Sequence, residues 1–96
     1  MDLGHALKVA LQTGKVRIGV TETIEAAKTK NARLVIASTS CPFTPFLSES
    51  RYEKVPVYHY PGTSVELGAA CGKPFPISAL AILDPGSSAI LSLETS

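Results

Sequence analysis

The sequence predicts an α/β protein, a three-layer α/β/α sandwich around a four-stranded mixed sheet. Segments in which apolar residues recur at helical spacing alternate with short apolar runs, in the order α-β-α-β-α-β-α-β. Of the 96 residues, 45% are hydrophobic and 18% are charged, a balance typical of a packed core and not of a disordered chain. Because this length supports one core, we expect residues 1–96 to form a single domain.

The first half of the chain begins with a helix expected over residues 2–13. Val16 to Ile18 alternates in polarity and is followed by a glycine, which indicates a short strand. A second helix follows, with Thr21 as its expected N-cap and Glu22 at the positive end of its dipole. Residues 34–37 are an apolar run too short for a helix, so we expect a buried central strand there.

The second half is expected to contain two helices and two strands. Thr44-Pro45 combines an N-cap residue with proline at the first helical position and predicts a short third helix. The β-rich run 55–60 predicts a strand. Thr63-Ser64-Val65-Glu66 is a capping box that begins a fourth helix, which Gly72 ends. Residues 77–83 are the last expected core strand.

Composition excludes several classes of protein. No apolar run is longer than the five residues Ala79 to Leu83, so no segment is expected to span a membrane. The first residues do not resemble a secretory signal, so we expect a cytoplasmic protein with reduced thiols at Cys41 and Cys71. The net charge is only +1, although residues 1–33 carry six Lys or Arg against three acids, which predicts a locally basic surface.

The sequence offers little catalytic or metal chemistry. Gly68 to Lys73 lacks the spacing of a phosphate-binding loop and is interpreted as a helix C-cap. The histidines and cysteines are too scattered for a zinc site. We therefore expect no enzymatic activity and no metal site. A small Cys-dependent enzyme is kept as an alternative because Cys41 lies in a Ser/Pro loop.

What remains is a surface for recognition. In Lys73-Pro74-Phe75-Pro76, two prolines hold a ring outside regular structure, where it can stack on an unpaired base beside a basic residue. The alternative is a loop aromatic folded over the core. Gly19 and Thr21 to Thr23 begin a helix whose N–H groups suit an anion, although capping alone explains them as well. The residues that could meet phosphates, or simply be solvated, are Lys15, Arg17, Lys28, Lys30 and Arg33.

Four blocks of the sequence together resemble one known family. The blocks are 13–19, 62–68, 72–75 and 78–86, and their specific parts are Glu-Leu-Gly and Asp-Pro-Gly. In this combination the chain resembles, over nearly its whole length, the large-subunit ribosomal protein L-thirty-e family of archaea and eukaryotes, in the kink-turn-binding L-seven-Ae superfamily. The resemblance implies an α/β/α sandwich in the large ribosomal subunit, beside other ribosomal proteins, that binds ribosomal RNA through three loops at one end. It also implies no catalysis, no cofactor and no small-molecule substrate.

The resemblance also implies roles for single residues. Gly19 and Thr21 to Thr23 would lie against the bent RNA backbone, and Ser40 takes the place of a base-reading asparagine. Phe75 takes the place of the stacking aromatic, and Lys73 that of its basic neighbour. Relatives usually carry a basic residue where this chain has Thr21 or Glu22, so we expect weaker affinity for an isolated kink-turn. The alternative is a stand-alone RNA-binding or protein-interaction module on the same fold.

Overall fold

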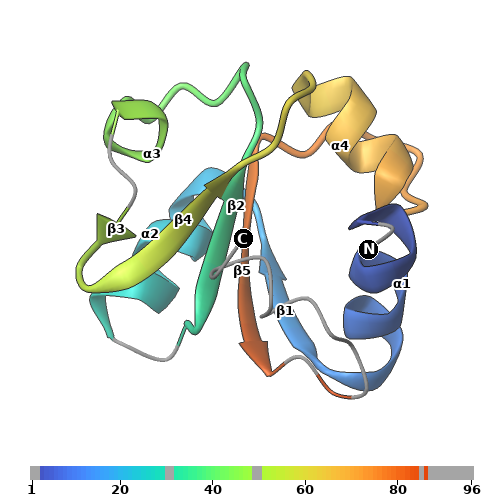
Figure 1. The fold of residues 1–96 in the computed structure, drawn as a ribbon, viewed down its shortest axis with the longest axis horizontal. Helices are drawn as coiled ribbons and strands as arrows, with labels where there is room; N and C mark the ends of the chain where they lie inside the picture. The colour runs from blue at the N-terminus through green and yellow to red at the C-terminus, as the bar shows by residue number, and fades with distance from the viewer. Residues whose placement is uncertain (1–2, 30–31, 49–50, 85, 87–96) are drawn as a thin grey trace.

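A five-stranded mixed sheet with helices on both faces organises the computed structural model (Figure 1). The structure describes residues 3–29, 32–48, 51–84 and 86. Residues 90–93, for which the sequence leaves both pairing and packing open, lie outside the described residues. The elements are α1 (Leu3–Thr13), β1 (Lys15–Ile18), α2 (Val20–Lys28), β2 (Leu34–Ala37), α3 (Pro45–Ser48), β3 (Arg51–Tyr52), β4 (Val55–His59), α4 (Ser64–Ala70) and β5 (Ala79–Asp84).

The strands lie in the order β1-β5-β2-β4-β3. β5 is antiparallel to both of its neighbours, β2 and β4 are parallel, and β3 is antiparallel to β4. The predicted α/β class and mixed sheet are confirmed, whereas the predicted number of four strands is wrong. The missed strand, β3, has only two residues and pairs through a turn at Glu53-Lys54, which lacks the glycine or asparagine that reveals such turns.

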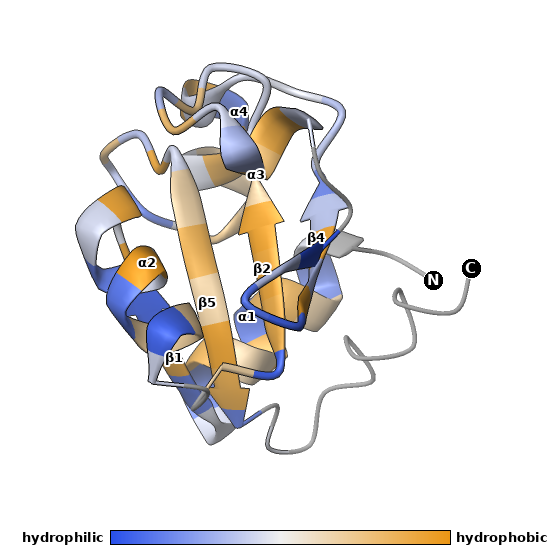
Figure 2. Ribbon diagram, turned by 90° about the vertical axis from the view of Figure 1, so that its left-hand side faces the viewer, coloured by the Kyte–Doolittle hydropathy of each residue, from blue (hydrophilic) through white to orange (hydrophobic). Residues whose placement is uncertain are grey.

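β2 and β5 form the buried centre of the sheet, as the apolar run 34–37 predicts. Figure 2 shows both strands largely in the colours of hydrophobic residues. Because side chains alternate along a strand, each strand contributes to two cores. Leu34, Ile36, Leu80 and Ile82 pack with residues of α1 and α4, and Val35, Ala37, Ala79 and Ala81 pack with residues of α2 and α3. The three layers follow from this alternation.

The start of α2 differs from the prediction. Thr21 does not cap the helix, because α2 begins at Val20 and its N-cap is Gly19, which makes no side-chain cap hydrogen bond. Gly19 has a φ of 111°, a conformation that residues with a side chain disfavour, and it is the single residue between β1 and α2. Thr23 makes the side-chain hydrogen bond in this turn: its hydroxyl donates to the Gly19 carbonyl at 2.6 Å.

Both ends of α4 are confirmed as predicted. The Thr63 N–H donates to Oε1 of Glu66 at 3.1 Å, and the Glu66 N–H donates to Oγ1 of Thr63 at 3.3 Å, which completes the capping box. Gly72 adopts a φ of 75°, and the Lys73 N–H donates to the Gly68 carbonyl at 2.9 Å. This is the Schellman arrangement expected of a terminal glycine.

The turn between β3 and β4 offers a test of stability. Glu53 and Lys54 have φ values of 52° and 69°, in the left-handed region that costs a residue with a Cβ about 1 kcal/mol. Lys54→Gly should therefore raise the free energy of unfolding by about 0.5–1 kcal/mol, measured by urea denaturation. Lys54→Ala removes the same charge but keeps the Cβ, and an equal gain from both variants would contradict the argument.

Candidate nucleic-acid interface

Four connections meet at one edge of the sheet, the upper edge in Figure 1. β1, β2 and β4 all run in the same direction and end there, while β5 begins there. We call this surface the loop edge and define it as residues 19–23, 38–44, 60–65 and 74–78. In α/β sheets, functional loops gather where strands hand over to helices, and this edge has that position.

Hydrogen bonds tie these connections to one another. The Ser38 N–H and hydroxyl both donate to the Ser78 carbonyl, at 2.9 and 3.0 Å. The Thr39 N–H and hydroxyl both donate to the Gly62 carbonyl, at 2.9 and 3.0 Å. Since each pair joins segments far apart in the sequence, these hydrogen bonds hold the connections of the loop edge in a defined arrangement.

The backbone at the start of α2 is open to close approach by another molecule. The Gly19 N–H donates to the Ala79 carbonyl at 2.9 Å, which ties this turn to the start of β5. A Cβ built at Gly19 would meet nothing within 4 Å, so the space beside this backbone is open. Thr21 and Glu22 are exposed, whereas Thr23 is fully buried. Thr23 therefore shapes the turn and does not present its side chain to a ligand.

The Phe75 loop lies across α4. Phe75 is 46% exposed between two exposed prolines, so its ring is not folded over the core. A Cβ at Gly68 of α4 would collide with the Phe75 carbonyl, so the loop reaches the helix only because residue 68 is glycine. The Ile77 N–H donates to the Ser64 carbonyl at 3.0 Å, which fixes the end of the loop beside the start of α4.

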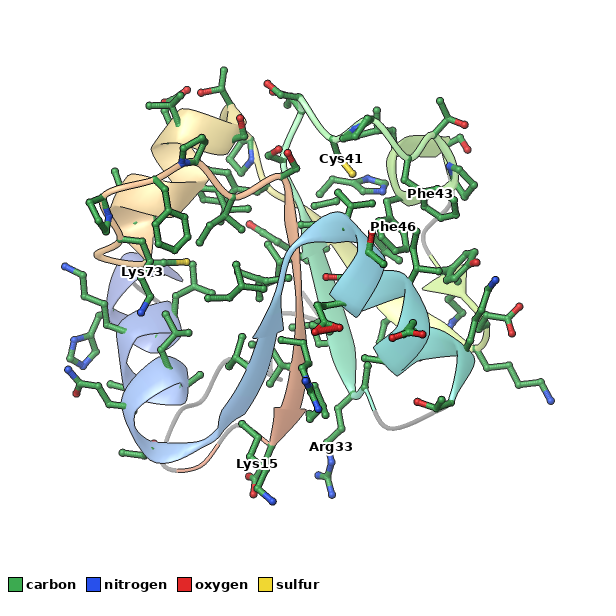
Figure 3. The ribbon with its side chains drawn as sticks, turned by 180° about the vertical axis from the view of Figure 1, so that it is seen from behind. Lys15, Arg33, Cys41, Phe43, Phe46 and Lys73 are labelled. Atoms are coloured by element: carbon green, nitrogen blue, oxygen red, sulfur yellow. The ribbon has the colours of Figure 1, made fainter. Side chains whose placement is uncertain are left out.

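The structure brings some predicted site residues together and separates others. Ser40 is exposed in the connection after β2, on the same edge as the Gly19 turn. Lys28 is the last residue of α2, about 12 Å along the helix from its start. Lys73 is half-buried and lies beside α4 and α1 in Figure 3, not among the loop ends. Two further predicted phosphate contacts, Lys15 and Arg33, lie at the opposite edge (Figure 3).

One exposed apolar residue of the loop edge escaped the sequence argument. Val65, the second residue of α4, is 67% exposed. The signal was present, because the capping box fixes where the helix begins and Leu67 and Gly68 are its buried residues, which leaves Val65 off the buried face. The loop edge therefore presents two large apolar side chains, Val65 and Phe75.

The loop edge contains no lysine or arginine. Its carboxylate, that of Glu22, lies 3.6 Å from Nη1 of Arg17 in β1. The carboxylate of Glu66, which directly follows the third connection, is held in the capping box. The exposed polar groups of this surface are mainly hydroxyls, so it suits hydrogen bonding and stacking more than the binding of phosphates by cations.

Comparison with known proteins finds a matching family model and curated relatives. Residues 1–92 match the family model described as the ribosomal protein L7Ae/L30e/S12e/Gadd45 family. The chain belongs to this family. A curated relative, the large ribosomal subunit protein eL30 of Methanococcus maripaludis strain C5, is 42% identical over 97 residues, which cover 98% of this chain and 92% of the relative. The eL30 proteins of Methanosarcina mazei and Methanospirillum hungatei are 45% and 44% identical, over 96% and 98% of this chain and 88% and 99% of their own.

The match to the L7Ae/L30e family confirms the resemblance predicted from the sequence. It also confirms the prediction that the chain is not an enzyme, since the relatives carry the names of ribosomal proteins. In the described ranges, no three His, Cys, Asp or Glu side chains form a group that could hold a metal ion. No helix in the described part of the chain is long and apolar enough to cross a bilayer.

The two thiols do not favour the alternative of a Cys-dependent enzyme. Both Cys41 and Cys71 are buried and free. Burial raises the pKa of Cys71 to about 11, which the nearby Lys73 charge only partly opposes, and burial also raises the pKa of Cys41. Since the thiolate is the nucleophile, the raised pKa of each thiol disfavours nucleophilic attack near neutral pH.

Gly68→Ala tests how the Phe75 loop is held. Alanine is normally the better helix former, but here its methyl group meets the Phe75 carbonyl, so the variant should lose about 1–3 kcal/mol in the free energy of unfolding. Chemical denaturation measures the loss, and amide shifts of residues 73–77 report the displaced loop. Ala69→Ser, at an exposed neighbouring position, should stay within about 0.5 kcal/mol. A stabilised Gly68→Ala variant would show that the loop does not need this contact.

The raised pKa of Cys71 predicts a pH dependence. The folded protein holds the thiol proton more tightly than the unfolded chain, because the pKa rises from 9.0 to about 11 on folding. This contribution to stability is complete below about pH 9 and is lost as the pH rises through 11. Alkylation of folded protein by iodoacetamide should be slow at neutral pH and accelerate only in that alkaline range. Rapid alkylation of Cys71 at neutral pH would contradict the burial argument.

Proposed function

We propose that the chain is a component of the large ribosomal subunit that binds ribosomal RNA with its loop edge, at a kink-turn or a similarly bent internal loop. The names of its relatives support the ribosomal part of this proposal. The observation that carries the RNA-binding part is the convergence of an open glycine turn, an exposed hydroxyl loop and an exposed aromatic ring on one edge, whose connections are held by hydrogen bonds.

Each element suits a different part of a bent RNA strand. The open space at Gly19 lets a sugar-phosphate backbone approach the start of α2, where Thr21 offers a hydroxyl. Ser40 offers a hydroxyl to the edge of an extruded base. Phe75 offers a flat ring on which such a base stacks, with Val65 as a second apolar contact.

The other proposed contacts lie outside the loop edge. Lys73 and Lys28 stand away from the loop edge, so they would meet only RNA that continues past the bend. Neighbouring ribosomal proteins are the expected protein partners, in a cytoplasmic ribosome. Sucrose-gradient sedimentation tests this assembly directly, because co-migration with large subunits supports the proposal and an exclusively free pool favours the stand-alone module.

Phe75→Ala tests the stacking contact. In a gel-shift titration with a kink-turn RNA, the variant should lose about 1–3 kcal/mol of binding free energy, because base-aromatic stacking contributes that much. Phe75→Tyr keeps the flat ring and should bind like the parent protein. If Phe75→Ala binds as tightly as the parent, the ring takes no part in the interface.

A further inference from the structure

Cations gather at the edge of the sheet opposite the loop edge. We call this surface the far edge and define it as residues 14–15, 28–29, 32–34, 53–54, 83–84 and 86, where β1, β2 and β4 begin and β5 ends. Its charged residues, all exposed, are Lys15, Lys28, Arg33 and Lys54, against the carboxylates of Glu53 and Asp84. The loop edge, by contrast, has one carboxylate, that of Glu22, and no lysine or arginine. The two edges therefore differ in the sign of their charge.

The strand order places three of these cations in a row. Lys15 is the register partner of Asp84 at the end of β5, and the N–H of Arg33, just before β2, donates to the Ile82 carbonyl at 2.7 Å. Lys54 directly precedes β4, the strand that pairs with β2. Because neighbouring strands lie about 4.8 Å apart, the order β1-β5-β2-β4 spreads the row over about 14 Å. Figure 3 shows Lys15 and Arg33 directed away from the loop edge.

The charges of this row are available to a ligand. Lys15, Arg33 and Lys54 are exposed, and none of them forms an ion pair with another described residue. The carboxylate of Asp84, which offsets part of the charge, accepts the Gly86 N–H at 2.9 Å. Lys28 differs from the row, because it ends α2 and its charge offsets the dipole of that helix.

The composition of the far edge favours a phosphate backbone over a protein or a base. The exposed large apolar side chains of the described residues, Leu47, Val65 and Phe75, all lie outside it. Protein interfaces are centred on such side chains, and stacking on bases requires an exposed ring. Lysine and arginine instead contact phosphates, which position a nucleic acid without reading its sequence. Beside Lys15 the surface is hollowed by about 400 Å³, which gives a phosphate a concave place to approach.

We propose that the far edge is a second nucleic-acid site, which binds the sugar-phosphate backbone of paired RNA without regard to sequence. Paired RNA suits it because such helices are contacted mostly through their shape and their phosphates. β5 runs from one edge to the other and, with six residues, is about 20 Å long, so this site is separate from the loop edge. The site does not depend on the loop edge. Only its consequence, that one copy links two RNA segments, rests on the function proposed above.

A short, fully paired RNA duplex, titrated by fluorescence anisotropy at several KCl concentrations, tests the site. Lys15→Gln and Arg33→Gln should each weaken binding about two- to fivefold near 50 mM salt. Each should also make the slope of log K against log salt shallower by ~0.9, the contribution of one phosphate contact. Lys8→Gln removes the same charge from an exposed position of α1, beside Gly72, and should leave both quantities nearly unchanged.

A kink-turn RNA with short stems separates this inference from the proposed function. The double variant Lys15→Gln with Arg33→Gln should bind it like the parent protein, and Phe75→Ala should bind the duplex like the parent. A parent that does not bind the duplex, or a double variant that binds it equally well, would overturn the inference and leave the proposed function intact.

Two competition experiments complete the test. If the short kink-turn RNA displaces the duplex, both RNAs share one surface and the inference is wrong. If poly-glutamate displaces the duplex at a lower concentration than unlabelled duplex does, the far edge is a site for an acidic protein, and the inference is wrong as well. A parent that binds the duplex and not the kink-turn would overturn the proposed function alone.

Discussion

The pairing of β5 with both β1 and β2 is the constraint on which the molecule depends. Residues 34–37 and 79–82 are almost completely shielded from water, so their backbone groups must bond to neighbouring strands. Two cores form on either side because successive side chains point to opposite faces. The same pairing brings the ends of β1 and β2 and the start of β5 to one edge, so the geometry of the candidate interface is a by-product of how the centre is buried.

Features with a local cause could be predicted from the sequence. The apolar run 34–37, the capping box at Thr63 and the terminal Gly72 each depend on residues within a few positions of one another, and all three are confirmed. The features that were missed have causes elsewhere in the chain. Gly19 caps α2 in a turn tied to the Ala79 carbonyl, and β3 exists because β4 offers it an edge to pair with.

The candidate site also combines features that could be predicted from the sequence with features that could not. The two prolines around Phe75 left open whether its ring is exposed or folded over the core, and the structure shows Phe75 46% exposed. Nothing in the sequence shows that Lys28 and Lys73 stand apart from the loop edge. Spacing along the chain does not reveal at which edge of the sheet a cation lies, because that depends on the direction in which its strand or helix runs. The pair between Arg17 and Glu22 also depends on the abrupt change of direction at Gly19, so its partners could be named only once that turn was known.

The strand order has a consequence for how the protein is made. β5 lies between β1 and β2, although it is the last strand of the described chain to be synthesised. While residues 79–84 are still inside the exit tunnel of a translating ribosome, the emerging chain lacks the partner that its first two strands share. Both cores then stay open to water, so the native domain forms as a whole only after the final strand has been released.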